Sequence, residues 1–151
     1  MHDLPRKLST DELSRLFEGR SRLVERLAVR EDPLGDAGHL LRDVPEEELI
    51  EALNAHPRIG ARRLSPQAAR EQSGDDDPAT GEELARLNLA YENRFGFRFV
   101  VFVNRRSKTE ILGVLRERLR RTRREELEAA VTDLVAIARD RYRLRRPGHT
   151  P

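Results

Sequence analysis

Residues 107–138, SKTEILGVLRERLRRTRREELEAAVTDLVAIA, contain two helix starts with the same signal. In each, a Ser or Thr is followed three residues later by Glu: Ser107 with Glu110, and Thr122 with Glu125. The hydroxyl and the carboxylate of such a pair accept hydrogen bonds from backbone N–H groups that the helix leaves unpaired. Apolar residues then recur at spacings of three and four, which predicts one buried face on each helix.

Related signals extend the helical pattern over most of the chain. Ser9 with Glu12 and Thr80 with Glu83 repeat the Ser/Thr–Glu spacing, and Gly96 is typical of a residue that ends a helix. Proline at a first-turn position predicts two further helices. These signals predict helices over about residues 10–30, 45–55, 65–73 and 80–96, in addition to the two helices within residues 107–138.

The segment FRFVVFV, residues 97–103, departs from this pattern because its aromatic and β-branched content is typical of a strand. An isolated strand could not satisfy its backbone groups in a core, and the chain offers no comparable partner. We therefore expect a buried extended link between helices, and an exposed loop over residues 73–81, SGDDDPATG. The predicted fold class is all-α, with one compact domain over residues 1–151 and a core from about 8 to 144.

Composition limits the classes of protein that need consideration. With 151 residues, 37% of them charged, the chain suits one water-soluble domain. No cysteine is present, which excludes thiol nucleophiles, disulfides and thiolate metal sites. No apolar stretch approaches 18 residues and the N-terminus lacks the layout of a signal peptide, so we expect a cytoplasmic protein without membrane insertion.

Residues 105–124 hold nine Arg or Lys against two Glu, although the formal net charge of the chain is only +2. Charge runs of this kind are most often solvated helix faces, and an acidic docking partner is the alternative. Binding to nucleic acid is not indicated, because the run lacks interleaved aromatic residues and a binding motif.

His56, in the stretch NAHPRIG, precedes a proline at the end of a predicted helix. A helix C-terminus favours imidazolium, and a nearby carboxylate would raise the pKa further, giving an acid–base group close to neutral pH. Taken alone, a histidine in this position is more often a capping or surface residue. His39 lies in an apolar turn, GHLL, where packing explains it, and no two histidines have metal-ligand spacing, so no metal site is expected.

Five segments taken together are more specific. In order, they are HPRIG at 56–60, REQ at 70–72, YENRFGFRFVV at 91–101, EILGVLRERL at 110–119 and AVTDLVAIARDRYRL at 130–144. In sequence and spacing they resemble the 2-oxo-4-hydroxy-4-carboxy-5-ureidoimidazoline (OHCU) decarboxylase family over about residues 8–144. The resemblance implies a compact all-α fold, usually a homodimer, that uses neither a metal nor an organic cofactor. It implies conversion of OHCU to (S)-allantoin in urate breakdown.

The resemblance also implies roles for individual residues. The catalytic positions fall on His56 and Glu71, and the substrate-binding positions fall on Pro57, Gln72, Arg118, Val100 and Val101. These residue types suit the chemistry, because an arginine fork holds a carboxylate or ureido oxygen and an amide both donates to and accepts from a urea-like ring. Loss of CO2 normally needs an electron sink, and an imine-type C=N in this small anionic substrate would supply it.

Some positions depart from the family pattern and keep other interpretations open. Ala68 stands where the family commonly has a substrate-binding serine, Arg121 stands where asparagine is frequent, and a common tryptophan is absent. Glu71 and Gln72 could be the solvated end of a short helix. The alternative function is a weakened or retired homologue that acts as a helical adaptor, binding an acidic partner through residues 105–124.

Overall fold

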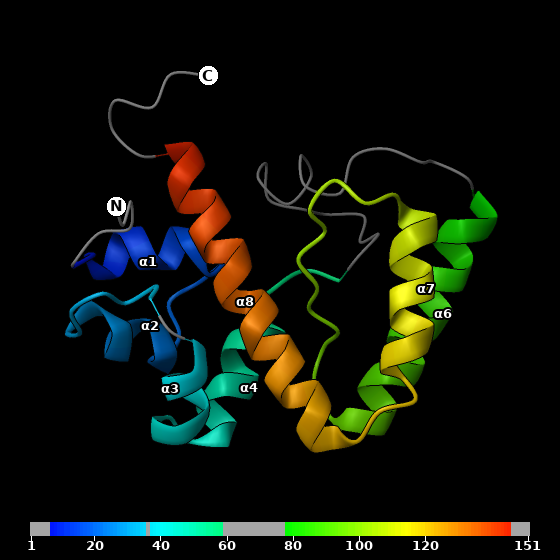
Figure 1. Ribbon diagram of the computed structural model, residues 1–151, viewed down its shortest axis with the longest axis horizontal. Coiled ribbons are helices and arrows are strands. Elements are labelled where there is room, and N and C mark those ends of the chain that lie inside the picture. The colour runs from blue at the N-terminus through cyan, green and yellow to red at the C-terminus, as the bar shows by residue number, and fades with distance from the viewer. Residues whose placement is uncertain (1–6, 36, 59–77, 146–151) are drawn as a thin grey trace. The chain divides into compact units, whose positions relative to one another are not determined.

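The computed structural model describes residues 7–35, 37–58 and 78–145, and these residues form seven helices and no strand (Figure 1). The helices are α1 (Thr10–Leu16), α2 (Arg22–Ala28), α3 (Ala37–Asp43), α4 (Glu46–Asn54), α6 (Pro78–Phe95), α7 (Lys108–Arg118) and α8 (Arg123–Arg145). The predicted all-α fold is confirmed.

The described residues fall into two compact units. The first unit extends to His56 and resumes at Val131, so that it contains α1 to α4 and the larger part of α8. The second unit runs from Pro57 to Ala130 and contains α6, α7 and the first turns of α8. The single domain expected over the whole chain stays a prediction.

The single helix predicted over residues 10–30 is wrong, because α1 and α2 are separated by a turn. Glu18 has φ +62° and Gly19 has φ +152°, and neither value is compatible with an α-helix. The chain starts the second helix afresh at Ser21, whose hydroxyl accepts a hydrogen bond from the backbone N–H of Val24 at 3.3 Å. The apolar stripe continues through the turn, so its periodicity did not reveal the break.

In the first unit, α2 packs against both α1 and α4. Arg26 of α2 forms an ion pair with Glu48 of α4, in which Nη2 donates to Oε2 at 3.0 Å. Glu51 of α4 accepts a hydrogen bond from the backbone N–H of Arg22, at the start of α2, at 2.8 Å. Apolar side chains fill the space between these helices, among them Leu13, Leu23, Leu27, Leu49 and Leu53.

Two local predictions in this unit have different outcomes. The helix that follows Pro45 ends at Asn54, which confirms the expected end near Ala55. His39 does not lie in a turn, because residues 37 to 43 form α3. This helix lacks a Ser/Thr–Glu start signal and contains Gly38, a poor helix former, and for these reasons the sequence did not indicate it.

In the second unit, α6 and α7 lie side by side (Figure 1). The expected start of α6 at Thr80 is wrong: the helix begins at Pro78, whose fixed φ suits a first turn, and residues 78–81 are therefore helical and not loop. Gly96 ends the helix as predicted, with φ +83° and its N–H donating to the carbonyl of Glu92 at 2.9 Å.

The two helix starts in residues 107–138 are confirmed. Ser107 Oγ accepts from the N–H of Glu110 at 3.1 Å, and a Glu110 carboxylate oxygen accepts from the N–H of Ser107 at 3.1 Å. Thr122 and Glu125 make the same reciprocal pair, at 3.1 and 2.9 Å. These local contacts define where α7 and α8 begin.

Residues 97–103 form the expected buried link, without helix or strand hydrogen bonding. Phe97 and Phe99 are almost fully buried and pack edge-on against the ring of Tyr91, with centroids 5.9 and 5.2 Å away. Phe95 packs against the same ring at 4.6 Å. The three phenylalanines are therefore core residues. None of the described helices combines the length and apolar character needed to cross a bilayer.

Candidate active site

The structure describes five of the seven predicted site residues. Glu71 and Gln72 lie outside the described residues, and so do Ala68 and the short helix predicted over residues 65–73. His56 belongs to the first unit, whereas Pro57, Val100, Val101 and Arg118 belong to the second. The candidate site residues are therefore divided between the two units.

His56 follows the C-terminal end of α4, and its backbone N–H donates to the carbonyl of Leu53 at 3.2 Å. Only 4% of the residue is exposed to solvent. A capping or surface histidine would keep its ring in water, so the burial argues against that interpretation of the sequence. The helix end and the following Pro57 together fix the place where the imidazole enters the interior.

Arg141 is a second buried ionisable residue in the same unit, with 3% exposure. It extends from α8, and its Nη1 donates to the carbonyl of Leu16, the last residue of α1, at 3.0 Å. Its Nη2 lies 3.0 Å from a carboxylate oxygen of Glu18. The guanidinium thus binds a carbonyl at the C-terminal end of α1, and the Glu18 carboxylate in the following turn neutralises its charge.

Burial lowers the pKa of His56 to about 3, and the nearby positive charge of Arg141 acts in the same direction. The expectation of a pKa raised toward neutrality is therefore wrong for the described surroundings. The weak field at the end of α4 is outweighed by the loss of solvation. At neutral pH the ring is uncharged, so it has one nitrogen that donates and one that accepts a proton.

Arg118 is the last residue of α7 and is also buried, with 4% exposure. Its Nη1 donates to the carbonyl of Val100 at 3.0 Å, and its Nε donates to Glu126 Oε1 at 2.7 Å. The guanidinium carbon lies 4.8 Å from the centroid of the Phe99 ring, over its face. Arg118 is thereby distinguished from the solvated arginines around it in the sequence.

Glu126 is fully buried, and its Oε1 also accepts a hydrogen bond from the hydroxyl of Tyr91 at 2.6 Å. Burial is the main reason that the pKa of Tyr91 is raised, so the phenol keeps its proton and acts as a donor. Tyr91, Arg118 and Glu126 come from α6, α7 and α8 and form one buried polar network.

The backbone of residues 97–103 is only partly available for binding a ligand. The Val100 carbonyl accepts from Arg118, while Val100 and Val101 are both almost fully buried. Pro57 is half-buried, and Arg58 beside it is held on α6 by two hydrogen bonds to Glu92, at 2.6 and 2.9 Å. The carbonyl of Val100 is therefore already bound by a protein side chain.

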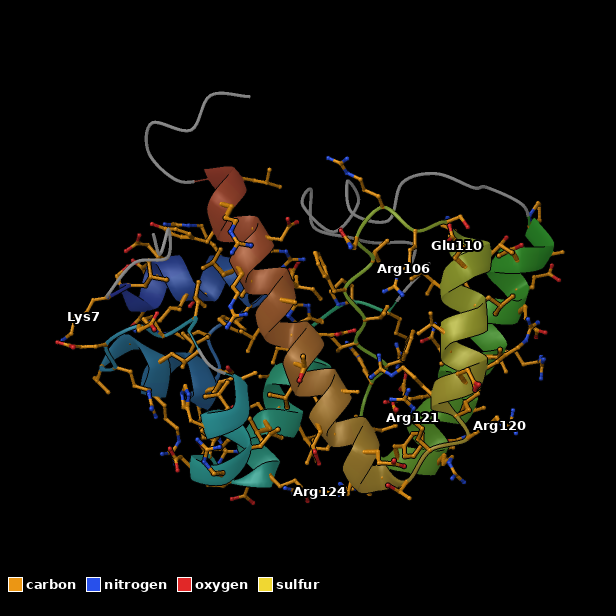
Figure 2. The ribbon with its side chains drawn as sticks, viewed as in Figure 1. Lys7, Arg106, Glu110, Arg120, Arg121 and Arg124 are labelled. Carbon is orange, nitrogen blue, oxygen red and sulfur yellow. The ribbon has the colours of Figure 1, made fainter. Side chains whose placement is uncertain are left out.

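Many cations in residues 105–124 have partners inside the second unit. Arg106 donates to the carbonyls of Phe102 and Val103, and Arg123 donates to the carbonyl of Phe95. Figure 2 shows Arg106 near the start of α7, whereas Arg120, Arg121 and Arg124 lie around the turn between α7 and α8. The basic residues are thus divided between the two ends of an 11-residue helix, about 16 Å long.

Three residues of these arrangements were not singled out from the sequence: Glu126, Arg141 and the hydroxyl of Tyr91. A signal was present, because Glu126 shares a stripe with Ala130 and Leu134, at a spacing of four, and both apolar residues are fully buried. A carboxylate on a buried face requires a buried partner. Within the described ranges, no three His, Asp or Glu side chains gather as a metal site would require.

Comparisons with known proteins show which family the chain resembles. The family model for OHCU decarboxylase matches residues 2–143. The uric acid degradation bifunctional protein PucL of Bacillus subtilis is 31% identical over 144 residues, a match that covers 87% of this chain and 29% of that protein. The OHCU decarboxylase of Halalkalicoccus jeotgali is 30% identical over 103 residues, covering 65% of this chain and 58% of the relative. The chain therefore matches less than two thirds of the length of either relative.

Solved structures show the same fold. A crystal structure of OHCU decarboxylase in the presence of (S)-allantoin superimposes with a TM-score of 0.72 at 24% identity, covering 86% of this chain and 94% of the other. A crystal structure of (S)-allantoin synthase gives a TM-score of 0.62 at 25% identity, covering 87% of this chain and 47% of the other. Because the family model extends over nearly the whole sequence and the fold agrees, the chain belongs to the OHCU decarboxylase family.

Proposed function

We propose that this protein decarboxylates OHCU and delivers (S)-allantoin, without a metal or an organic cofactor. In this reaction the bond from the ring to the carboxylate breaks and CO2 leaves. The electron pair moves into the adjacent C=N, whose nitrogen takes up a proton. The ring hydroxyl then gives up its proton, and a proton adds to one face of the carbon that carried the C=N, so that one net proton is taken from solvent. The protein has to orient an anion and transfer protons on one side only.

His56 is proposed as the proton-transferring group, together with Glu71. The neutral imidazole suits the first step, because an uncharged ring nitrogen accepts the hydroxyl proton without first losing one of its own. His56 or Glu71 then delivers a proton to carbon. Pro57 is proposed to contact the substrate beside it, and Gln72 to bind the urea-like edge of the ring.

Arg118 is proposed to hold the substrate's carboxylate or ureido oxygen. A guanidinium is a planar set of donors and stays charged when buried, so it suits an anion in a site with little water. Val100 and Val101 are proposed to line the ring through their backbone and side chains.

The single observation that carries the proposal is the burial of the two described family residues that ionise. His56 and Arg118 are each only 4% exposed, although an isolated histidine at a helix end and one arginine among many would be expected in solvent. Burying such groups costs free energy, and proteins accept this cost most often at functional sites.

The adaptor alternative has less support. It requires a continuous basic surface along residues 105–124, whereas Arg118 is buried and Arg106, Arg116 and Arg123 are engaged by groups within the second unit. Arg121, the departure from the family's asparagine, is exposed beyond the end of α7 and not part of the buried network.

A stereochemical assay tests the proposal. Freshly prepared OHCU decays slowly to racemic allantoin, so circular dichroism distinguishes the catalysed reaction from the background. The protein is expected to give a rapid signal for the (S) product, and His56→Ala is expected to lose it. If wild type and His56→Ala both leave the background rate and the racemic product unchanged, the decarboxylase assignment is wrong.

Two further properties belong to the proposal. We infer a homodimer in solution, from the family resemblance, and a molar mass measured by light scattering near twice 17.4 kDa would support it. A cytoplasmic location is inferred on the same basis.

A further inference from the structure

We propose that Glu126 and Tyr91 are positioning residues that hold the guanidinium of Arg118 in one orientation before the substrate arrives. The inference rests on the proposed function, in which Arg118 binds the anionic substrate. Neither residue was assigned a role by the sequence pattern, and both belong to the second unit together with Arg118.

The contacts define the orientation of the guanidinium. Nε is fixed by Glu126 Oε1 at 2.7 Å, and Nη1 is fixed by the carbonyl of Val100 at 3.0 Å. The guanidinium carbon lies over the ring of Phe99, 4.8 Å from its centroid. Two hydrogen bonds on different nitrogens, together with the Phe99 ring beside the group, oppose rotation of the guanidinium.

Tyr91 acts on Arg118 through the carboxylate. Its hydroxyl donates to the same Oε1 that accepts from Arg118 Nε, at 2.6 Å, so the oxygen is held from two directions. The phenol ring is itself held by Phe95, Phe97 and Phe99, with centroids 4.6 to 5.9 Å away. The aromatic cluster therefore fixes the carboxylate, and the carboxylate fixes the guanidinium.

Stability alone does not explain this network. The side chains of Arg118 and Glu126 are 5% and 0% exposed, and a buried ion pair of this kind is usually no more stabilising than apolar residues of the same size. Preorganisation does explain it, because a donor fork that is already oriented loses little conformational entropy when an anion binds.

A double-mutant cycle tests the inference. Tyr91→Phe and Glu126→Gln are each made in the wild type and in Arg118→Lys, and kcat and KM for OHCU are measured by circular dichroism. In the wild-type background we expect kcat/KM to fall about tenfold for Glu126→Gln and about threefold for Tyr91→Phe, the range typical of coupled neighbours. In the Arg118→Lys background, where the fork is absent, either change should alter kcat/KM less than about twofold.

Matched controls use the same substitutions elsewhere on α8. Glu128→Gln removes a carboxylate that pairs with Arg124 at the exposed surface, and Tyr142→Phe removes a hydroxyl that is not in the network. Both should leave kcat/KM unchanged. Equal losses in the two Arg118 backgrounds, or no loss in either, would overturn the inference. If Glu126→Gln does not fold, the Tyr91→Phe arm decides alone.

A second readout does not depend on activity. The Nε–H of Arg118 should give a slowly exchanging ¹⁵N resonance in the wild type, and its exchange should be faster in Glu126→Gln and in Tyr91→Phe. Unchanged exchange in both variants would refute the positioning role. Should the wild type be inactive on OHCU while exchange responds as expected, the proposed substrate is wrong and the orientation of Arg118 by Glu126 and Tyr91 is upheld.

Discussion

Arg141 Nη2 lies 3.0 Å from a carboxylate oxygen of Glu18, and the two side chains are 3% and 13% exposed. The pair links the C-terminal part of the chain to the turn that separates α1 from α2, where Glu18 has φ +62°. The same guanidinium contributes to the lowered pKa of His56. Changes at Arg141 should therefore affect both stability and proton transfer.

Removing one member of the pair should destabilise the protein. Arg141→Met leaves the Glu18 carboxylate without its guanidinium in the interior, and we expect the free energy of unfolding in urea to fall by about 3–5 kcal/mol. The double variant Arg141→Met with Glu18→Gln should recover part of this loss. Arg124→Met, which breaks an exposed pair with Glu128, serves as the control and should cost less than about 1 kcal/mol. A loss in Arg141→Met no larger than in this control would contradict the expected role of the pair.

His56 should not titrate in the neutral range. Because its folded pKa is about 3, against about 6.5 when unfolded, the unfolded state binds more protons between these values. The stabilisation that comes from keeping His56 neutral is therefore fully present above pH 6.5. As the pH falls toward 3 it is lost, and the free energy of unfolding decreases by up to about 1.4 kcal/mol per pH unit. Histidine NMR and urea unfolding at several pH values measure both effects, with His56→Gln as the comparison. A His56 resonance titrating near pH 6.5 would show that the imidazole is solvated.

Alanine substitutions at Gly96 and Gly113 should change the stability of the protein in opposite directions. Gly96 has φ +83°, so a Cβ there is strained although no atom lies within 4 Å, and Gly96→Ala should cost about 1–2 kcal/mol. Gly113 is exposed within α7 and also has open space, so Gly113→Ala should stabilise by about 0.5–1 kcal/mol. Thermal unfolding of both variants, compared with the wild type, measures the two changes in stability. Shifts of the same sign would show that the backbone at one of these positions is different.

The cap of α7 should depend on the hydroxyl of Ser107. Ser107→Ala removes the acceptor for the N–H of Glu110 and should cost about 1 kcal/mol, whereas Ser107→Gly should cost only a few tenths. Both are compared with the wild type by urea unfolding. Stability of Ser107→Ala equal to that of the wild type would mean that the hydroxyl contributes little.

Local features of the fold could be predicted from the sequence, and contacts between distant residues could not. The start of α7 at Ser107 and the end of α6 at Gly96 depend on residues three or four positions apart, which the sequence displays directly. The break after α1 was missed because Gly19 interrupts a stripe whose apolar spacing is otherwise regular. Periodicity reports which residues are buried, and a turn that preserves the burial pattern leaves it unchanged.

The polar interior was the less predictable part of the candidate site. Tyr91 and Glu126 are 35 residues apart, and Arg141 reaches a carbonyl 125 residues away. Nothing in either residue's neighbourhood specifies such a partner. The family resemblance pointed to His56 and Arg118, while the direction of the pKa shift at His56 required knowledge of its burial.

The proposed function depends most on one claim, that His56 and Arg118, from different parts of the chain, serve one ligand. Titrating labelled protein with (S)-allantoin, while following the ring C–H signals of His56 and the Nε–H signal of Arg118 by NMR, tests it most directly. We predict that both sets of signals shift along one binding curve with one Kd. Shifts confined to one residue, or two curves with different midpoints, would contradict it.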